Sequence, residues 1–118
     1  MANQTVHNIS YTVAYTDTTS FLIGYLPPNA YITDITCLIT TDFTDGVLDV
    51  GDATTANLYA DDIALNGTGK QTVTSTSSWG AVASTTDQTE IKGIVVATGT
   101  GLAAGSAKVI VEYVYNNL

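Results

Sequence analysis

The sequence contains few of the side chains that carry positive charge or perform chemistry. Its 118 residues include three lysines, no arginine, one histidine and one cysteine, and the formal net charge is −8. So few positively charged side chains cannot form a basic patch that would attract nucleic acid or an anionic membrane surface, and we expect neither as a partner. One cysteine cannot form an intramolecular disulfide. The shortage of reactive groups also argues against an enzyme, and we expect no cofactor and no small-molecule substrate.

Long hydrophobic runs are missing as well. A membrane-spanning helix needs about 18 apolar residues in a row, and the apolar runs in this sequence are much shorter. The first ten residues, MANQTVHNIS, have neither the basic nor the apolar region of a secretory signal. We therefore expect a protein that is made in a cytoplasm, and we treat the N-x-[ST] matches at Asn3, Asn8 and Asn66 as chance occurrences.

The residues that are abundant favour β-structure. Threonine is the commonest residue, and valine, isoleucine and tyrosine recur with it. Such β-branched and flat side chains suit a pleated surface, and apolar and polar residues alternate with a period of two. We expect strands at residues 6–16, 20–26, 30–43, 47–50, 70–78, 87–98 and 106–115, with a short apolar piece at 79–83.

One long segment lacks this alternation. Residues 53–65, ATTANLYADDIAL, hold alanine, leucine and paired aspartate with few β-branched side chains, so we expect one or two helical turns or an ordered loop there. Turn residues separate the other segments. They are Pro27–Pro28, which cannot donate to a ladder, Asp45–Gly46, Asn66–Gly69 and the glycines between 99 and 105.

About eight strands at this spacing predict an all-β fold, a single-domain antiparallel β-sandwich that is jelly-roll-like. No linker divides the chain, and no internal repeat is evident. We expect residues 9–118 to form the sandwich. Residues 1–8 form a short polar segment without charged side chains. We expect this segment to be an N-terminal arm that orders on contact with a neighbour.

Two glycine-containing strings match parts of nucleotide-binding motifs. Gly99-x-Gly101-x-x-Ala104 fits a dinucleotide fingerprint, which needs a helix after the glycines to face the pyrophosphate. The residues that follow, AKVIVEYVY, alternate as a strand does. Gly69–Lys70 matches the end of a P-loop, but Ala64 and Gln71 occupy the positions that require Gly and Ser or Thr. We therefore assign these glycines to turns.

The remaining candidates for chemistry are one possible reactive pair and one acidic cluster. His7 and Cys37 would act as base and nucleophile only if both reached one pocket with an orienting carboxylate. Six aspartates admit two interpretations, carboxylates that cap turns or a Ca²⁺ site, since Ca²⁺ prefers oxygen ligands. The six are Asp42, Asp45, Asp49, Asp52, Asp61 and Asp62.

Aromatic and apolar residues on the strand faces indicate contacts with other chains. Tyrosine is enriched at interfaces, and tyrosines recur on matching faces of the first and last expected strands, where filling the core is the other interpretation. Residues 91–96 are apolar on both faces, so one face needs a covering loop or a partner. The candidate interface residues are Val6, His7, Tyr11, Tyr15, Ile94, Val96, Tyr113 and Tyr115.

Three segments occur in a suggestive order: LPPNAYITDITCLITTDF, DGVLDVGDA and AAGSAKVIVEYVY. Their pattern comprises Leu26–Pro27, Ile32-Thr33-Asp34, Val50-Gly51-Asp52 and the strand from Val109 to Tyr115. With this pattern the chain resembles the small all-β head decoration, or cement, proteins of tailed bacteriophages. The shared motifs include no catalytic or ligand residue, so the resemblance concerns architecture alone.

The resemblance implies a structural virion protein that binds the outer surface of a phage head. It would stabilise contacts between subunits of the major capsid protein, and it would form a homotrimer. The alternative is a host- or glycan-binding module of a phage fibre or tail, in which Trp79 or Tyr59 would line an exposed pocket.

Overall fold

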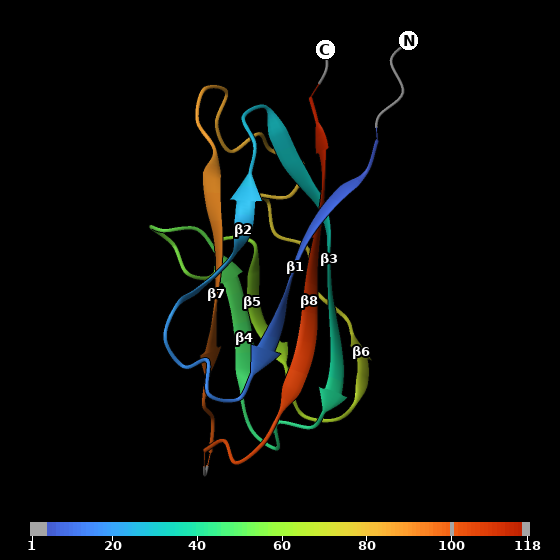
Figure 1. Cartoon of the computed structure of the whole chain (residues 1–118), viewed down its shortest axis with the longest axis vertical. Helices are drawn as coiled ribbons and strands as arrows, with labels where there is room; N and C mark the ends of the chain where they lie inside the picture. The colour runs from blue at the N-terminus through green and yellow to red at the C-terminus, as the bar shows by residue number, and fades with distance from the viewer. Residues whose placement is uncertain (1–4, 100, 117–118) are drawn as a thin grey trace.

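The chain forms eight strands and no helix in the part that the structure describes. The computed structural model describes residues 5–99 and 101–116, and none of its segments is a helix able to cross a membrane. Figure 1 shows the arrangement. The strands are β1 (His7–Ala14), β2 (Phe21–Leu26), β3 (Ala30–Thr41), β4 (Val47–Gly51), β5 (Ala60–Ala64), β6 (Gly69–Gln71), β7 (Thr89–Val96) and β8 (Ser106–Tyr115).

The strands form two four-stranded sheets that pack face to face. Their orders are β1-β8-β3-β6 and β2-β7-β4-β5, and in Figure 1 the first sheet lies on the right and the second on the left. The pairs β1–β8, β2–β7, β3–β6 and β4–β5 are all antiparallel. This nested pairing is one long hairpin folded over into two layers, which is the jelly-roll arrangement. The expected β-sandwich is confirmed.

The core lies between the sheets and uses alternate residues of each strand. On β8, Ala107, Val109 and Val111 point inward and are at most 1% exposed, whereas Lys108 between them is exposed. Burying one aliphatic side chain of this kind stabilises the fold by about 1.5–3 kcal/mol. The largest fully buried side chains are Phe43, Leu26, Ile32, Ile39, Leu48, Leu65, Ile91, Val13, Val50, Val95, Val109 and Val111.

Aromatic stacking closes the side of the sandwich where β1 and β2 meet. The rings of Tyr11 and Phe21 are stacked, with 4.3 Å between their centroids and 18° between their planes. Gly93, opposite Phe21 on β7, leaves room for that ring, because a Cβ there would lie 2.6 Å from Phe21 Cζ. A Cβ on Gly24 would lie 3.0 Å from Ile9. Gly93 therefore seats the Phe21 ring within its own sheet, and Gly24 lets β2 lie close to β1 of the other sheet.

The expectation of helical turns or a loop at residues 53–65 is wrong for its second half. Residues 60–64 form β5, which pairs with β4. Ala60 and Ile63 are 0% and 3% exposed, so burial against the core selects the strand although the segment has few β-branched residues.

The expected strand at residues 70–78 is also shorter than its alternation indicates. It ends at Gln71, the last residue of β6. After Gln71 the chain forms hydrogen bonds to the residues that precede β5. The Thr76 hydroxyl donates to the Leu58 carbonyl at 2.8 Å, and Trp79 Nε1 donates to the Tyr59 carbonyl at 2.7 Å. These contacts hold the segment away from the edge of β3.

The first strand begins inside the stretch that was expected to be an arm. His7 and Asn8 pair with Tyr113 and Glu112 in the β1–β8 ladder, so the sandwich starts two residues before the expected boundary at residue 9. Residues 1–4 of the expected arm lie outside the described residues.

Replacing Gly93 with Ala should destabilise the protein by about 1–3 kcal/mol, the usual cost of overpacking a well-filled site. The added methyl group would collide with the Phe21 ring, so in a Phe21→Ala background the same change should cost much less. Urea denaturation of the four variants of this double-mutant cycle measures the coupling.

Gly24→Ala is the matched control, because its methyl group would meet Ile9 and not Phe21. Phe21→Ala should not relieve it. Additive effects of Gly93→Ala and Phe21→Ala would contradict the close approach described for this side of the sandwich.

Candidate functional site

Three of the candidate interface residues meet at one end of the sandwich. His7 stacks on Tyr113 at 5.4 Å between ring centroids and meets the edge of Tyr115 at the same distance. Val6, just before β1, is 57% exposed, and at this end of the sandwich β1 begins and β8 ends in Figure 1. Burial, with a smaller contribution from Tyr115, raises the pKa of Tyr113. The result is an aromatic cluster beside an exposed apolar residue.

The other candidates occupy different places. Tyr11 lies in the stacked contact between β1 and β2, and Tyr15 is 37% exposed just after β1. Ile94 and Val96 face outward from β7, with Val96 exposed and Ile94 half-buried. The structure therefore distributes the candidate residues over the sandwich end, its β1–β2 side and the outer face of one sheet.

That outer face also carries residues that the sequence did not single out. Leu22 on β2 is 39% exposed, and Val47 on β4 lies directly opposite Val96. Both belong to strands whose other face fills the core, and only the pairing of β2, β7 and β4 shows that their outward residues are neighbours. In the sequence, the alternation of inward and outward residues along each strand was the available signal that Leu22 and Val47 point outward.

Three of the six aspartates meet on the same face. The carboxylate oxygens of Asp49, Asp61 and Asp62 lie within 4.8 Å of one another. The pairing of β4 with β5 is irregular here, so Asp61 and Asp62 both lie opposite the region of Asp49. The Asp62 N–H donates to Asp49 Oδ1 at 2.8 Å, with a φ of 55° at Asp62. Desolvation, together with the nearby Asp62 and Asp61 charges, raises the pKa of Asp49.

This trio is the acidic group with the geometry to hold a divalent cation, since Ca²⁺ takes carboxylate oxygens. Two of the remaining aspartates serve turns instead. Asp42 accepts the N–H groups of Thr44 and Gly67 at 2.8 Å and 2.9 Å, and Asp52 accepts those of Thr54 and Thr55. The turn interpretation therefore applies to Asp42 and Asp52, and a Ca²⁺ site at Asp49, Asp61 and Asp62 stays a prediction.

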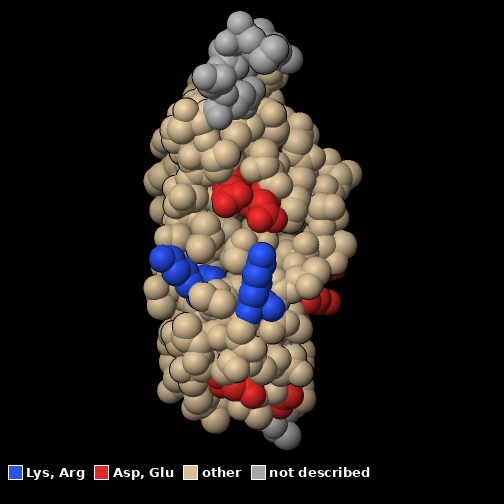
Figure 2. Space-filling view, turned by 90° about the vertical axis from the view of Figure 1, so that its right-hand side faces the viewer, with Lys and Arg blue, Asp and Glu red and all other residues tan. Residues whose placement is uncertain are grey.

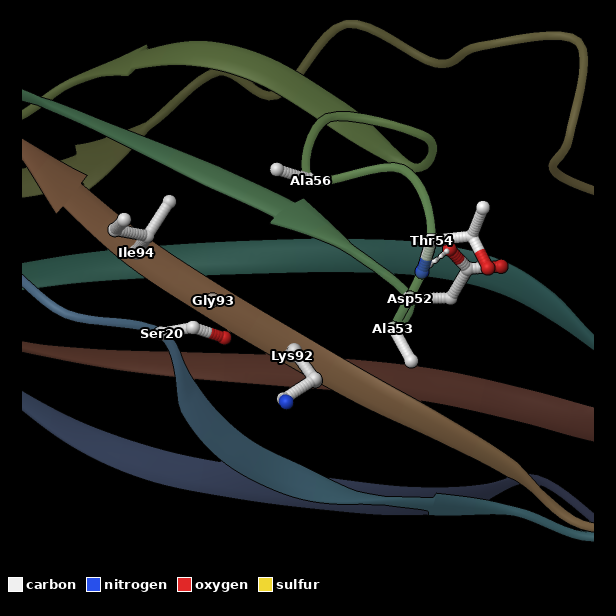
Figure 3. A pocket seen from close by; sticks show the side chains of 8 residues that line it. All are labelled: Ser20, Asp52, Ala53, Thr54, Ala56, Lys92, Gly93 and Ile94. Carbon is white, nitrogen blue, oxygen red and sulfur yellow. Dashed lines mark hydrogen bonds between the residues drawn. The ribbon is translucent and has the colours of Figure 1, made fainter.

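A shallow pocket of about 200 Å³ lies beside this face. Figure 3 shows it between β7 and the loop that follows β4. The loop folds back over Gly51, where a Cβ would collide with the Thr55 carbonyl oxygen. Its lining combines apolar and small residues with one lysine: Ser20, Asp52, Ala53, Thr54, Ala56, Lys92, Gly93 and Ile94.

The aromatic residues proposed for glycan binding do not form an exposed platform. Tyr59 is 3% exposed, and burial raises its pKa, helped by the charge of Asp52. Trp79 is half-buried and packs against the core, with its indole N–H bonded to the Tyr59 carbonyl. This specific expectation of the glycan-binding alternative is wrong.

His7 and Cys37 do not form a reactive pair. Cys37 lies opposite Val109 and His7 opposite Tyr113, and four residues along β8 separate these positions by about 13 Å. Burial raises the pKa of the Cys37 thiol to about 11, so the thiol stays protonated at neutral pH and behaves as a small core residue.

Comparison with known proteins identifies the fold. No protein-family profile and no curated protein matches the sequence. A chain of the capsid asymmetric unit of cyanophage Pam1 superposes with a TM-score of 0.71 at 24% identity, covering 95% of this chain and 86% of that one. A chain of the acid-stable capsid of Helicobacter pylori bacteriophage KHP30 gives 0.61 at 11% identity, covering 95% and 91%. One from the capsid of Ralstonia phage GP4 gives 0.62 at 19% identity, covering 98% and 86%.

Replacing Asp49 with Asn should raise the melting temperature at pH 7 and leave it unchanged in strong acid. The pKa of Asp49 is raised on folding, so its ionised form disfavours the folded state above both its folded and unfolded pKa values. That penalty vanishes below both values, where the group is protonated in either state. Thermal unfolding at about pH 7 and about pH 2 measures the effect.

Asp42→Asn is the matched control of opposite sign. The N–H groups of Gly67 and Thr44 lower the pKa of Asp42, so its contribution to stability is present above its unfolded pKa and is lost as pH falls through its folded pKa. We expect a lower melting temperature at pH 7 that converges with the parent protein in acid. Shifts of the same sign in both variants would contradict these electrostatic assignments.

Proposed function

We propose that this chain is a structural protein of a bacteriophage head, a decoration or cement protein without enzymatic activity. It binds the outer surface of the capsid and stabilises contacts between subunits of the major capsid protein. The observation that carries the proposal is the fold, a jelly-roll sandwich that matches chains from three phage capsids over 95–98% of its length. The resemblance of three sequence segments to phage decoration proteins points to the same class.

The surface supports attachment to protein. Val6, Leu38 and Val96 are 57%, 42% and 41% exposed, so large apolar side chains are available for burial in contacts with the shell or with another copy of this chain. A chain with three lysines and a net charge of −8 is repelled by packaged nucleic acid, which favours the outer side of the shell. The same charge keeps free copies soluble in the host cytoplasm before assembly.

Attachment as a homotrimer would need no exceptional contact. Interfaces of about 800 Å² per partner give micromolar to nanomolar affinities. Three linked copies that engage the shell together gain up to about 10²–10⁴-fold in avidity. A trimer on the virion surface therefore binds firmly even where each single contact is modest.

Purified protein should co-sediment with phage heads that lack it. We expect saturation at about one trimer for each three-fold region of the shell, measured from the protein in the pellet. Heads that already carry the protein are the control and should take up none. Binding to whole host cells or immobilised glycans, with none to heads, would contradict the proposal and support a fibre or tail module.

Removing residues 1–6 should weaken head binding about tenfold or more, a loss of roughly 1.4 kcal/mol. His7 and Asn8 of the expected arm already belong to β1, so we propose that residues 1–6 act as the arm that orders on contact with a neighbour. This truncation leaves the β1–β8 pairs intact. The melting temperature should stay unchanged. Unaltered co-sedimentation of the truncated protein would contradict the role of the arm.

A further inference from the structure

The outer face of the β1-β8-β3-β6 sheet carries a row of positive charge around an apolar side chain. Lys108 on β8 and Lys70 on β6 both lie directly opposite Leu38 on β3, and Leu38 is 42% exposed. Neighbouring strands are about 4.8 Å apart, so the two lysine backbones lie within about 10 Å of each other. Figure 2 views this side, with two blue side chains near its middle and red ones above them. We call this surface the lysine face.

The outer face of the β2-β7-β4-β5 sheet carries the opposite charge beside apolar side chains. Asp49, Asp61 and Asp62 form its acidic trio. Ile94 lies directly opposite Asp49 on β7, and Val96 follows two residues later on the same outward side. We call this surface the acidic face.

Other charged groups on these two faces do not cancel the contrast. On the acidic face, Lys92 is paired with Glu90 at 3.7 Å. On the lysine face, Asp34 and Glu112 lie opposite each other, four residues along β8 from Lys108 and about 13 Å away. The positive row and the acidic trio therefore each remain a local concentration of one sign.

Charge complementarity selects a second copy of this chain as the occupant. Two acidic faces would repel each other, since like charges brought together across an interface cost free energy. The chain has three lysines and no arginine, and two of the lysines form the row around Leu38. The best match for the acidic face on this molecule is thus the lysine face of another copy.

The available area also suits a stable contact. Four strands about 4.8 Å apart give a face about 19 Å wide. The longest strand of the lysine face, β3, has 12 residues and spans about 40 Å, and that of the acidic face, β7, has 8 and spans about 26 Å. The overlapping strands supply about 500 Å² of the roughly 800 Å² that a specific interface needs from each partner, and the loops beside them supply the rest.

We infer that copies of this chain associate head to tail, with the lysine face of one copy packed on the acidic face of the next. Leu38 lies against Ile94 and Val96, while Lys70 and Lys108 reach the acidic trio. Such a heterologous contact uses two different surfaces and closes into a ring when the rotation between copies allows it. The inference rests on the homo-oligomer of the proposed function and adds which surfaces form it.

Charge reversal tests the contact by light scattering of the free protein. The double variants Lys70→Glu/Lys108→Glu and Asp61→Lys/Asp62→Lys should each lose the oligomer, with association weakened at least about tenfold. Mixing the two should restore association between unlike copies, because each contact between them joins either the two reversed faces or the two unaltered ones. A three-membered ring keeps one contact between like copies, so we expect species of two or three copies in which unlike variants are paired. Raising NaCl from about 0.05 M to about 1 M should dissociate the parent oligomer.

Thr18→Glu/Thr19→Glu is the control for added negative charge, since both residues are exposed in the loop after β1, and it should keep the parent mass. Thermal unfolding of each variant shows whether it is folded. A monomeric parent protein, or a mixture that stays dissociated, would overturn the inference. So would rescue of Lys70→Glu/Lys108→Glu by Asp34→Lys/Glu112→Lys in the same chain, which indicates self-association of the lysine face. Co-sedimentation with heads tests the proposed function separately.

Discussion

The pairing of the two ends of the chain is the constraint on which the rest of the structure depends. β8 lies between β1 and β3, so the last strand in the sequence joins the first strand to the third. The pairs β2–β7 and β4–β5 nest inside this contact in the other layer. Because such pairs join residues far apart in sequence, the chain must close long loops before burial stabilises either sheet. Neither sheet has a covered inner face until both are formed.

The inner faces of both sheets form the core, so the side chains that can contact other proteins lie on the outer faces and at the ends of the sandwich. Cys37 is buried in the core, and burial raises the pKa of its thiol. Tyr11 closes the β1–β2 side by stacking on Phe21. The groups left outside are apolar side chains, hydroxyls and separated charges, which suit contacts with other proteins. The proposed role in a phage head and the head-to-tail association both rely on these surfaces.

A shift in the pairing of β4 with β5 creates the acidic trio on one outer face. The shift in pairing between β4 and β5 places Asp61 and Asp62 beside Asp49, where an even ladder would have sent them to opposite sides of the sheet. Desolvation, and then the like charges of Asp62 and Asp61, raise the pKa of Asp49, and its ionised form disfavours the folded state at neutral pH. A positively charged neighbour relieves that repulsion, so the same feature that costs stability in the free chain favours association.

The sequence by itself determined the fold class, most strand positions and the inward residues, because alternation and turn residues are local signals. The last strand, residues 106–115, is an example in which both ends were predicted. Tertiary structure decided the rest. It made residues 60–64 a strand through burial of Ala60 and Ile63, and it withdrew residues 72–78 from the sheet through hydrogen bonds to Leu58 and Tyr59. It alone placed Lys70 and Lys108 on either side of Leu38, and Asp49 beside Asp61, since strand pairing sets those neighbours and no local pattern records it.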